Sequence, residues 1–359
     1  MKILVVGGGI VGLSTAWALV RLGHTPVVYD QGTVPNPMAA SYDQHRIIRL
    51  AYGERDGYCR MVKPAFQAWR RLWRDLGEQH YVETGTLLIG GRADDYASSR
   101  ASFDRLNMPY EELDKAAIKQ LWPFLRLRSD AWGLYNAEGG VLLADRIVGA
   151  LTVWLRNQGS EIHPQTMVRD VDFHHAIVTL NDHTQHEGDA VVVAADAWAP
   201  QPLPELAAHV KPIRQAVIYL RPPGHYLQCW RHSPVIVDFG GTDDARAIPP
   251  VADTGLKVGA GSHRRPGDLS SPRILAPDEP AQMLTYFESA LEDFDRYEVI
   301  EGRVCYYGWS MDERFVVKTS QCAVAITGGS GHMFKFGALL GMELAGLVTG
   351  EQDQADFTR

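Results

Sequence analysis

The sequence contains few cysteines, no long apolar run and no excess of basic residues, and each absence excludes a class of protein. Its 4 cysteines include no C-x-x-C pair, which fits a reducing compartment better than a disulfide framework. No uninterrupted apolar stretch approaches the roughly 18 residues that a membrane-spanning helix needs. Asp and Glu (43) outnumber Lys and Arg (35), for a net charge of −8, which argues against a nucleic-acid surface. We therefore expect a cytoplasmic enzyme with no nucleic-acid partner, no membrane partner and no metal site.

The rest of the composition is that of an ordinary soluble globular protein. The chain has 359 residues, of which 45% are hydrophobic and 22% are charged. It is therefore long enough for a large core and for two subdomains. The apolar run at its start is short and passes directly into a glycine cluster, so we expect no signal peptide.

The first thirty residues, MKILVVGGGIVGLSTAWALVRLGHTPVVYD, are the most informative stretch. An apolar run leads into Gly7, Gly9 and Gly12 in the spacing G-x-G-x-x-G. A helix-like segment and a second apolar run follow, ending at Asp30. The glycines allow a tight turn, a close approach to a pyrophosphate and helix–strand packing, while Asp30 accepts hydrogen bonds from a ribose. The unit predicts a dinucleotide site; the alternative is a glycine-rich turn without a ligand.

The later segments predict an α/β fold with two domains. A helical pattern at 145–157 and a buried apolar run at 189–195 indicate a return to a parallel sheet, so the first domain is discontinuous. Residues 205–310 contain short alternating runs separated by Pro, Gly and Asp, as in an antiparallel sheet, with an amphipathic helix at 279–294. The predicted dinucleotide-binding domain comprises 1–80, 139–205 and 311–359, and the predicted substrate domain comprises 81–138 and 206–310.

Local patterns give further expectations. Residues 62–76 carry apolar residues at helical spacing, and 81–90 and 161–173 are each predicted to form a strand. The segment RIIRLAYGE at 46–54 would place its two arginines, three residues apart, on one side if it were helical. A solvated face is the alternative explanation for those arginines. A second glycine-rich turn, at 328–336, precedes a small-residue helix and offers another set of helix-terminal N–H groups to a ligand.

These blocks together resemble the glycine/D-amino acid oxidase (DAO) family of FAD flavoproteins. Within it, the chain is similar to the branch of monomeric sarcosine oxidase and N-methyltryptophan oxidase. The resemblance covers most of the chain and implies a Rossmann-like FAD-binding domain of the GR2 type, with a substrate domain on a mostly antiparallel sheet flanked by helices. Besides the glycine unit, it is carried by R-I-I-R-x-A-Y-G-E at 46–54, T-G-x-L at 84–87, G-G-V-L at 139–142, A-x-A-W at 195–198, G-L-K-x-G at 255–259, C-x-Y at 305–307, D-E-x-F at 312–315 and G-x-S-G-H-x-F-K-F at 328–336.

The resemblance implies roles for five residues at the reacting end of the site. Arg49 and Lys335 match the pair that holds a substrate carboxylate, and a guanidinium with an ammonium makes a fixed clamp for an anion. Lys257 matches the lysine that assists the reaction with oxygen, where a cation stabilises developing superoxide; a solvated strand lysine is the alternative. Tyr307 and His332 match residues that line the substrate cavity.

The resemblance also implies how FAD is held. Cys305 matches a cysteine that attaches covalently to the flavin; the alternative is an inert buried thiol. Attachment requires a thiolate, which a nearby positive charge such as that of Arg46 favours. Val168, Gly331 and Lys335 complete the cofactor-binding set with the glycine unit and Asp30.

The chain departs from the family pattern at several positions. Asp196 stands where a glycine is usual, and a carboxylate there would repel phosphate unless it points away. Met333 also replaces a glycine, and the strand ARAIPPV around Arg246 lacks a cavity tyrosine that sarcosine oxidase has there. His263 lies two residues later than a family histidine. The substrate pocket is therefore expected to differ from that of sarcosine oxidase.

The reaction implied is oxidation of the C–N bond of an amino acid or an N-methyl or other secondary amine. A hydride equivalent passes to flavin N5, an imine forms, and O2 is reduced to H2O2. The substrate is a small molecule with a carboxylate. The alternatives are a dehydrogenase with another electron acceptor, an NAD-dependent enzyme, and a flavin-binding protein without catalytic activity.

Overall fold

The computed structural model describes residues 1–53, 55–91, 96–240 and 244–352. Glu54, which ends the 46–54 motif, and residues 353–359 of the predicted first domain lie outside the described residues. Among the helices described, none is both long and apolar enough to cross a membrane.

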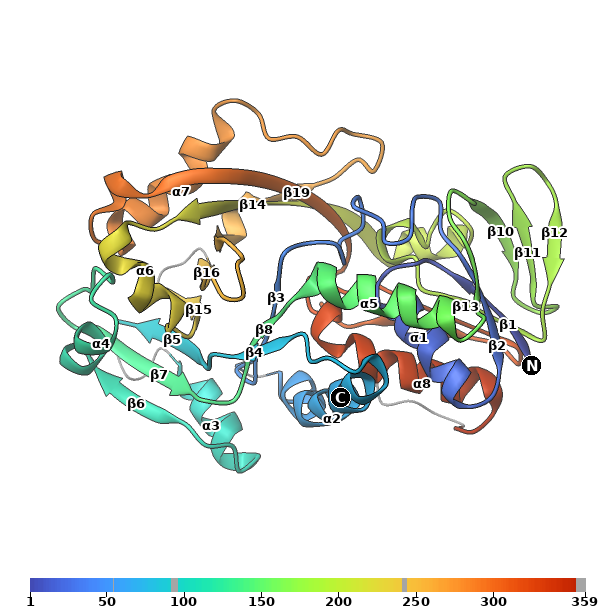
Figure 1. The fold of residues 1–359 in the computed structure, drawn as a ribbon, viewed down its shortest axis with the longest axis horizontal. Helices are drawn as coiled ribbons and strands as arrows, with labels where there is room; N and C mark the ends of the chain where they lie inside the picture. Colours follow the sequence, from blue (N-terminus) through green and yellow to red (C-terminus); the bar gives the residue numbers. More distant parts are fainter. Residues whose placement is uncertain (54, 92–95, 241–243, 353–359) are drawn as a thin grey trace.

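The first large sheet has six strands in the order β20-β21-β13-β1-β2-β9, parallel except for the edge strand β20 (Figure 1). Its centre is the apolar run of the glycine unit, fully buried because helices cover it, as expected for a parallel sheet. All six strands come from the segments assigned to the dinucleotide-binding domain: β1 (Lys2–Val6), β2 (Thr25–Tyr29), β9 (Glu161–His163), β13 (Ala190–Val193), β20 (Val316–Thr319) and β21 (Ala323–Thr327).

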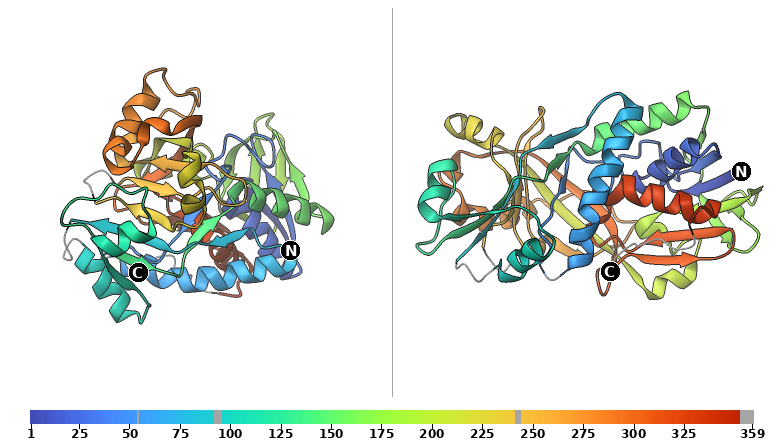
Figure 2. Two further views of the ribbon diagram at one scale, coloured as in Figure 1. Left: turned by 60° about the vertical axis from the view of Figure 1, so that its left-hand side comes forward. Right: turned by 90° about the horizontal axis from the view of Figure 1, so that it is seen from below.

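Helices α1 (Ile10–Arg21), α5 (Ala144–Asn157) and α8 (Gly337–Thr349) pack beside this sheet. Small residues let α8 approach α1 closely: a Cβ on Gly337 would lie 2.5 Å from Ile10 Cγ1, and one on Gly341 would overlap the backbone of Ser14. Helix α2 (Asp56–Leu76) lies beside α8 at the boundary between the two large sheets (Figure 2). Helix α8, late in the chain, therefore packs closely against helix α1, near its beginning.

The second large sheet has nine strands and is antiparallel except where β15 pairs with β5. Its longest strands, β14 and β19, arch across the molecule from this sheet toward the first one (Figure 1). All nine come from the segments assigned to the substrate domain: β5 (Thr86–Gly90), β6 (Glu111–Asp114), β7 (Trp132–Asn136), β14 (Val210–Arg221), β15 (Val235–Asp238), β16 (Arg246–Ile248), β17 (Leu256–Gly259), β18 (Arg264–Pro266) and β19 (Glu298–Ser310).

Smaller elements complete the fold. Two three-stranded sheets have the orders β3-β8-β4 and β10-β11-β12, and short helices cover the second large sheet. Their bounds are β3 (Arg46–Ile48), β4 (Tyr81–Glu83), β8 (Gly140–Leu142), β10 (Val168–Asp172), β11 (Ile177–Leu180), β12 (Gln185–Glu187), α3 (Ala97–Arg105), α4 (Lys115–Leu121), α6 (Gly224–Arg231) and α7 (Glu279–Ala290).

Residues Arg46–Ile48 form a strand that pairs with β8, so the condition under which Arg46 and Arg49 would share a helical face is not met. Two local expectations were wrong. Residues 81–90 form two strands, β4 and β5, since Gly85 breaks them with a φ of +71° in the left-handed region. The predicted strand at 161–173 is likewise two strands, β9 and β10, which belong to different sheets.

Candidate functional site

A cavity of about 550 Å³ brings together all the residues singled out from the sequence except Gly12. It extends from the glycine turn after β1 to the sheet face formed by β14, β16, β17 and β19. The predicted residues that line it are Gly7, Gly9, Asp30, Arg46, Arg49, Val168, Lys257, Cys305, Tyr307, Gly331, His332 and Lys335.

The glycine turn has the geometry that a pyrophosphate requires. Gly7 has a φ of +112°, and a Cβ there would lie 2.6 Å from the Ala194 carbonyl oxygen. Helix α1 begins at Ile10, and its N-cap residue Gly9 offers no capping side chain. Ile10 N donates to Ser41 Oγ at 2.9 Å, and the positive end of the helix lies at the cavity. Gly12 is not among the described residues that line the cavity. A Cβ at Gly12 would overlap the Gly7 carbonyl group, so glycine at this position lets the helix pack closely against the strand and turn.

Asp30 closes this end of the cavity. Its Oδ2 accepts a hydrogen bond from Gly8 N at 2.8 Å, and its Oδ1 accepts from Gly32 N at 2.8 Å and from Asn36 Nδ2 at 3.0 Å. A carboxylate offers about four acceptor positions, so Oδ2 retains one for a ribose hydroxyl. Val168, the first residue of β10, lines the same part of the cavity. These residues fit the adenosine end of a dinucleotide.

Sheet register places the reacting-end residues on one face. On β19, Arg303, Cys305 and Tyr307 alternate with buried neighbours and so point to the same side. Lys257 on β17 lies opposite Tyr219 of β14 in an antiparallel pair, which puts both on a common face. Side chains from distant segments thus meet at the cavity through strand pairing.

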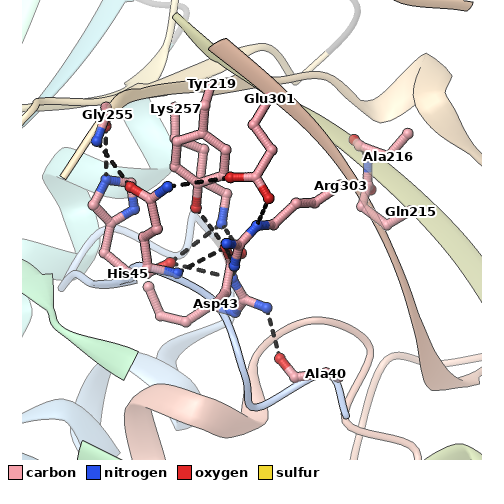
Figure 3. Close-up of polar contacts among 12 residues, drawn as sticks. Ala40, Asp43, His45, Gln215, Ala216, Tyr219, Gly255, Lys257, Glu301 and Arg303 are labelled. Atoms are coloured by element: carbon pink, nitrogen blue, oxygen red, sulfur yellow. Dashed lines mark hydrogen bonds and ion pairs between the residues drawn. The ribbon is translucent and has the colours of Figure 1, made fainter. Parts of the chain in front are cut away.

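A buried aspartate that the sequence analysis missed organises part of this face (Figure 3). Asp43 is 4% exposed, and its Oδ2 lies 2.5 Å from Lys257 Nζ. It also forms an ion pair with Arg46, accepts a hydrogen bond from the Tyr219 hydroxyl, and lies 3.3 Å from Arg303 Nη1. We call these five residues the Asp43 cluster. The only sequence signal was an acidic residue three positions before Arg46 in an apparent loop.

The charges of the Asp43 cluster shift one another. Burial alone would raise the pKa of Asp43, but Arg46 and Lys257 hold it well below its usual range. Burial and the Arg46 guanidinium lower the pKa of Lys257 to about 8, against the opposing effect of Asp43. Asp43 therefore keeps Lys257 mostly protonated at neutral pH despite its burial.

Cys305 lies beside this cluster. Burial raises the pKa of the Cys305 thiol, and Arg46 and Lys257 oppose that shift without reversing it. The thiolate-favouring effect expected of Arg46 is therefore present but smaller than the effect of burial. All four cysteines are free.

The opposite part of the reacting end holds cations without an internal partner. Arg49 and Lys335 lie over the same ring, with Arg49 Cζ 5.0 Å and Lys335 Nζ 5.3 Å from the Tyr52 centroid. Neither forms an ion pair within the part of the chain that the structure describes. Lys335 is 5% exposed, and burial with the nearby Arg49 and Arg246 holds its pKa well below the usual range. These are the properties of a site for an anion.

The two remaining predicted residues adjoin this group. His332 Nε2 lies 3.6 Å from Glu313 Oε2, and burial with Lys335 and Arg49 lowers the pKa of His332 to about 3. Tyr307 is buried, which raises its pKa. Both side chains are therefore neutral at physiological pH.

The departures from the family pattern have separate outcomes. Asp196 turns to the backbone: its Oδ2 accepts a hydrogen bond from Gly308 N at 3.2 Å, and burial raises its pKa to about 6. Met333 and Arg246 line the cavity. His263 lies in a one-turn helix (Gly261–His263) and is not among the described residues that line the cavity.

Comparison with known proteins places this geometry in context. The family model DAO, FAD dependent oxidoreductase, matches residues 2–347. N-methyl-L-tryptophan oxidase of Salmonella heidelberg (strain SL476) is 25% identical over 368 residues, covering 99% of this chain and 96% of that protein. NikD, an amino acid oxidase essential for nikkomycin biosynthesis, has a TM-score of 0.81 at 20% identity, covering 98% of this chain and 94% of that one. L-proline dehydrogenase from P. horikoshii has a TM-score of 0.84 at 17% identity with the same coverage, 98% and 94%. The predicted fold class is thereby confirmed.

Proposed function

Since the chain belongs to the DAO family of FAD-dependent oxidoreductases, we propose that it oxidises the C–N bond of a small amino acid or secondary amine and passes the electrons to O2. One observation carries this proposal: a single cavity joins the glycine turn to Arg49 and Lys335. The similarity to N-methyl-L-tryptophan oxidase over almost the whole chain supports an amino acid substrate. FAD is the cofactor, so the NAD-dependent alternative is set aside.

The chain's own residues bind and orient the two partners. Gly7, Gly9 and Asp30 would hold the dinucleotide end of FAD, with Val168 and Gly331 along the cavity and Cys305 as the attachment point near the reacting end. Bound FAD would supply the redox chemistry by taking a hydride equivalent from the carbon beside the amine.

Arg49 and Lys335 would bind the substrate carboxylate. A guanidinium and an ammonium together fix both the position and the plane of a carboxylate. The anion would also supply the negative charge that this group lacks and restore the proton on Lys335. Holding the carboxylate fixes the neighbouring amine-bearing carbon, which is the positional contribution of the protein to rate.

Lys257 would provide the positive charge for the reaction with oxygen. A buried cation stabilises an anion that develops next to it, and does so without reorganisation when other groups hold it in place. The 2.5 Å contact with Asp43 supplies that restraint. Tyr307 and His332, both neutral, would line the amine end and add no competing charge.

One observation favours a second candidate, a dehydrogenase with another electron acceptor. The Asp43 carboxylate offsets the charge of Lys257, which reduces the attraction for an oxygen-derived anion. The fold similarity to L-proline dehydrogenase is compatible with either acceptor.

An anaerobic titration tests the proposal. The purified holoenzyme is mixed with N-methyl, cyclic and D-amino acids, and we expect at least one to bleach the flavin absorbance band. Readmission of air should then restore the band and yield one H2O2 per flavin reduced. Slow recovery without peroxide selects the dehydrogenase, and no bleaching by any amino acid or amine refutes oxidation. A yellow pellet after acid precipitation supports attachment through Cys305, and a colourless pellet contradicts it.

A further inference from the structure

Arg246 adds a third cation to the part of the cavity that holds Arg49 and Lys335. It begins β16 and lies opposite Gly259 of β17, on the sheet face that lines the cavity. The three charges lie close enough to affect one another: beyond the effect of burial, Arg49 and Arg246 both lower the pKa of Lys335 against a smaller opposing effect of Asp244, and Arg49 lowers the pKa of Arg246. We call Arg49, Arg246 and Lys335 the cavity cations.

The described residues supply too few carboxylates in ion-pair contact to balance these cations. Asp244 forms an ion pair with Arg246 but shares it with Arg264, whose Nη2 lies 3.4 Å from the same Asp244 Oδ2. Asp238 acts on Arg49 only from beyond ion-pair distance. The one carboxylate of a simple amino acid, bound by Arg49 and Lys335, would therefore still leave an excess of positive charge.

The three carboxylates among the described lining residues are already committed elsewhere. Asp30 accepts hydrogen bonds from the glycine turn, Asp43 lies within its own cluster, and Asp196 accepts one from Gly308 N. None of them is within ion-pair distance of Arg49, Arg246 or Lys335 in the part of the chain described. A ligand with negative charge would therefore complement these cations better than the described carboxylates do.

Arg246 also retains donors for a ligand. Its hydrogen bonds to the described chain, to the Asp244 carboxylate and carbonyl oxygen, both leave from Nη2. The Nη1 and Nε groups remain to donate, and a guanidinium presents such donors in a fixed planar fork that matches a carboxylate.

From this geometry we propose that the substrate is an acidic amino acid, whose side-chain carboxylate binds Arg246 while its main carboxylate binds Arg49 and Lys335. This inference rests on the proposed function and narrows its substrate class to amino dicarboxylates. If the substrate had a neutral side chain, the Nη1 and Nε groups of Arg246 would face it without an acceptor. Leaving such donors unsatisfied in a partly desolvated site costs free energy.

The test compares acidic substrates with neutral ones of the same shape. Anaerobic bleaching of the holoenzyme is followed with N-methylaspartate and N-methylglutamate, in both stereochemical forms, against N-methylasparagine and N-methylnorvaline. A charge-assisted hydrogen bond contributes about 1.5–3 kcal/mol, so we expect the acidic compounds to react with about 10- to 100-fold higher efficiency. Arg246→Met should lower the efficiency with acidic compounds far more than that with neutral ones, and Arg246→Lys should restore part of the preference.

Arg264→Met is the matched control, because Arg264 shares Asp244 but does not line the cavity. It should preserve the preference for acidic compounds. Binding gives a readout independent of turnover: succinate should raise the melting temperature of the holoenzyme more than propionate does, and Arg246→Met should abolish the difference. If Arg246→Met fails to fold, Arg246→Lys and the wild-type comparison of succinate with propionate still decide the question.

The outcomes separate the inference from the function it rests on. Equal or faster bleaching by neutral or aromatic amino acids, or equal losses for acidic and neutral compounds in Arg246→Met, overturns the acidic-substrate inference and leaves oxidation standing. A preference for aromatic compounds would assign Arg246 to stacking on a ring instead. Failure of every amino acid to bleach the flavin refutes the proposed function itself.

Discussion

Two groups of cations, each with members that line the same cavity, differ in their ion pairs. In the Asp43 cluster, Arg46, Lys257 and Arg303 each pair with the same carboxylate, Asp43. Among the cavity cations, Arg49 and Lys335 have no ion pair within the described chain, and Arg246 shares its partner Asp244 with Arg264. Every cation of the first group thus has a carboxylate partner in the protein, whereas our proposal assigns the partner of the second group to an anionic ligand.

The difference shows in the two buried lysines. Burial lowers the pKa of both. Asp43 opposes the shift at Lys257 through direct contact and holds its pKa at about 8, whereas Lys335 has no carboxylate in ion-pair contact within the described chain and its pKa lies well below the usual range. An internal carboxylate thus favours the protonated form of Lys257, and binding of an anion would favour the protonated form of Lys335 in the same way.

Removing the internal carboxylate should have the largest effect on stability. Asp43→Asn leaves Arg46 and Lys257 buried with no negative partner, and breaking a buried ion pair from one side costs about 3–5 kcal/mol. We expect that loss in the free energy of unfolding, measured by urea denaturation at a fixed FAD concentration.

Glu298→Gln serves as the matched carboxylate-to-amide control. Glu298 pairs with Arg221 at the surface, where their side chains are 66% and 65% exposed. Exposed pairs contribute little, so this variant should stay within about 1 kcal/mol of wild type. An equally small effect for Asp43→Asn would show that the cluster does not hold its cations in place.

Removing a cavity cation should act in the opposite direction on the ligand-free protein. Burial and the neighbouring arginines hold the pKa of Lys335 well below its usual range, so folding disfavours its charged form. Lys335→Met removes that cost and should raise the free energy of unfolding by about 2 kcal/mol, as apolar replacements of buried charges often do. The same variant should lose inhibition by small carboxylates, since one of the two clamp residues is gone.

Urea denaturation and inhibition by acetate measure the two effects on one preparation. Lys318→Met, which removes a surface lysine paired with Glu205, should leave both within about 0.5 kcal/mol of wild type. If Lys335→Met destabilised the protein as much as Asp43→Asn, the contrast between the two groups would be lost.

The sequence predicted single residues of both cation groups better than the contacts that join them, for a physical reason. The glycine unit is local, so its strand, turn and helix could be predicted from residues adjacent in the chain, and the family resemblance then pointed to Arg49, Lys257 and Lys335. The Asp43 cluster instead joins a loop residue to side chains from β3, β14, β17 and β19, and Asp43 contacts Lys257 across 214 sequence positions. No periodicity within a loop signals such a contact.

The same limit applies to 46–49. Spacing placed Arg46 and Arg49 on a shared face only if the segment were helical, and pairing with β8 makes Arg46–Ile48 a strand. Both arginines still line the cavity, Arg46 toward Asp43 and Arg49 toward Tyr52. Which cation belongs to which group was therefore set by tertiary contacts and not by spacing.

The smallest predicted effect is the contribution of Lys257, in the Asp43 cluster, to the pH dependence of stability. The folded pKa of Lys257 is about 8, below the value of about 10.4 for an unfolded lysine. Between these values the unfolded chain binds more protons than the folded one, so stability rises with pH. Lys257→Met should lack this contribution. From pH 8 to pH 9 the free energy of unfolding of the wild type should therefore rise by roughly 1 kcal/mol relative to that of the variant, somewhat less than the free energy that corresponds to one full pKa unit.

Comparing the two proteins over pH 7.5–9.5 by urea denaturation keeps other groups constant. Lys335 makes the stability of wild type and of Lys257→Met rise with pH, because its folded pKa is lowered. Tyr219 and Tyr307 have raised pKa values in the folded state, so they lower the stability of both proteins only where tyrosines of the unfolded chain ionise, near pH 10. Parallel curves for wild type and Lys257→Met would mean that Lys257 does not titrate in this range. Asp43 would then keep the pKa of Lys257 above this range despite the burial of the cluster, and the pKa values of Lys257 and Lys335 would differ even more.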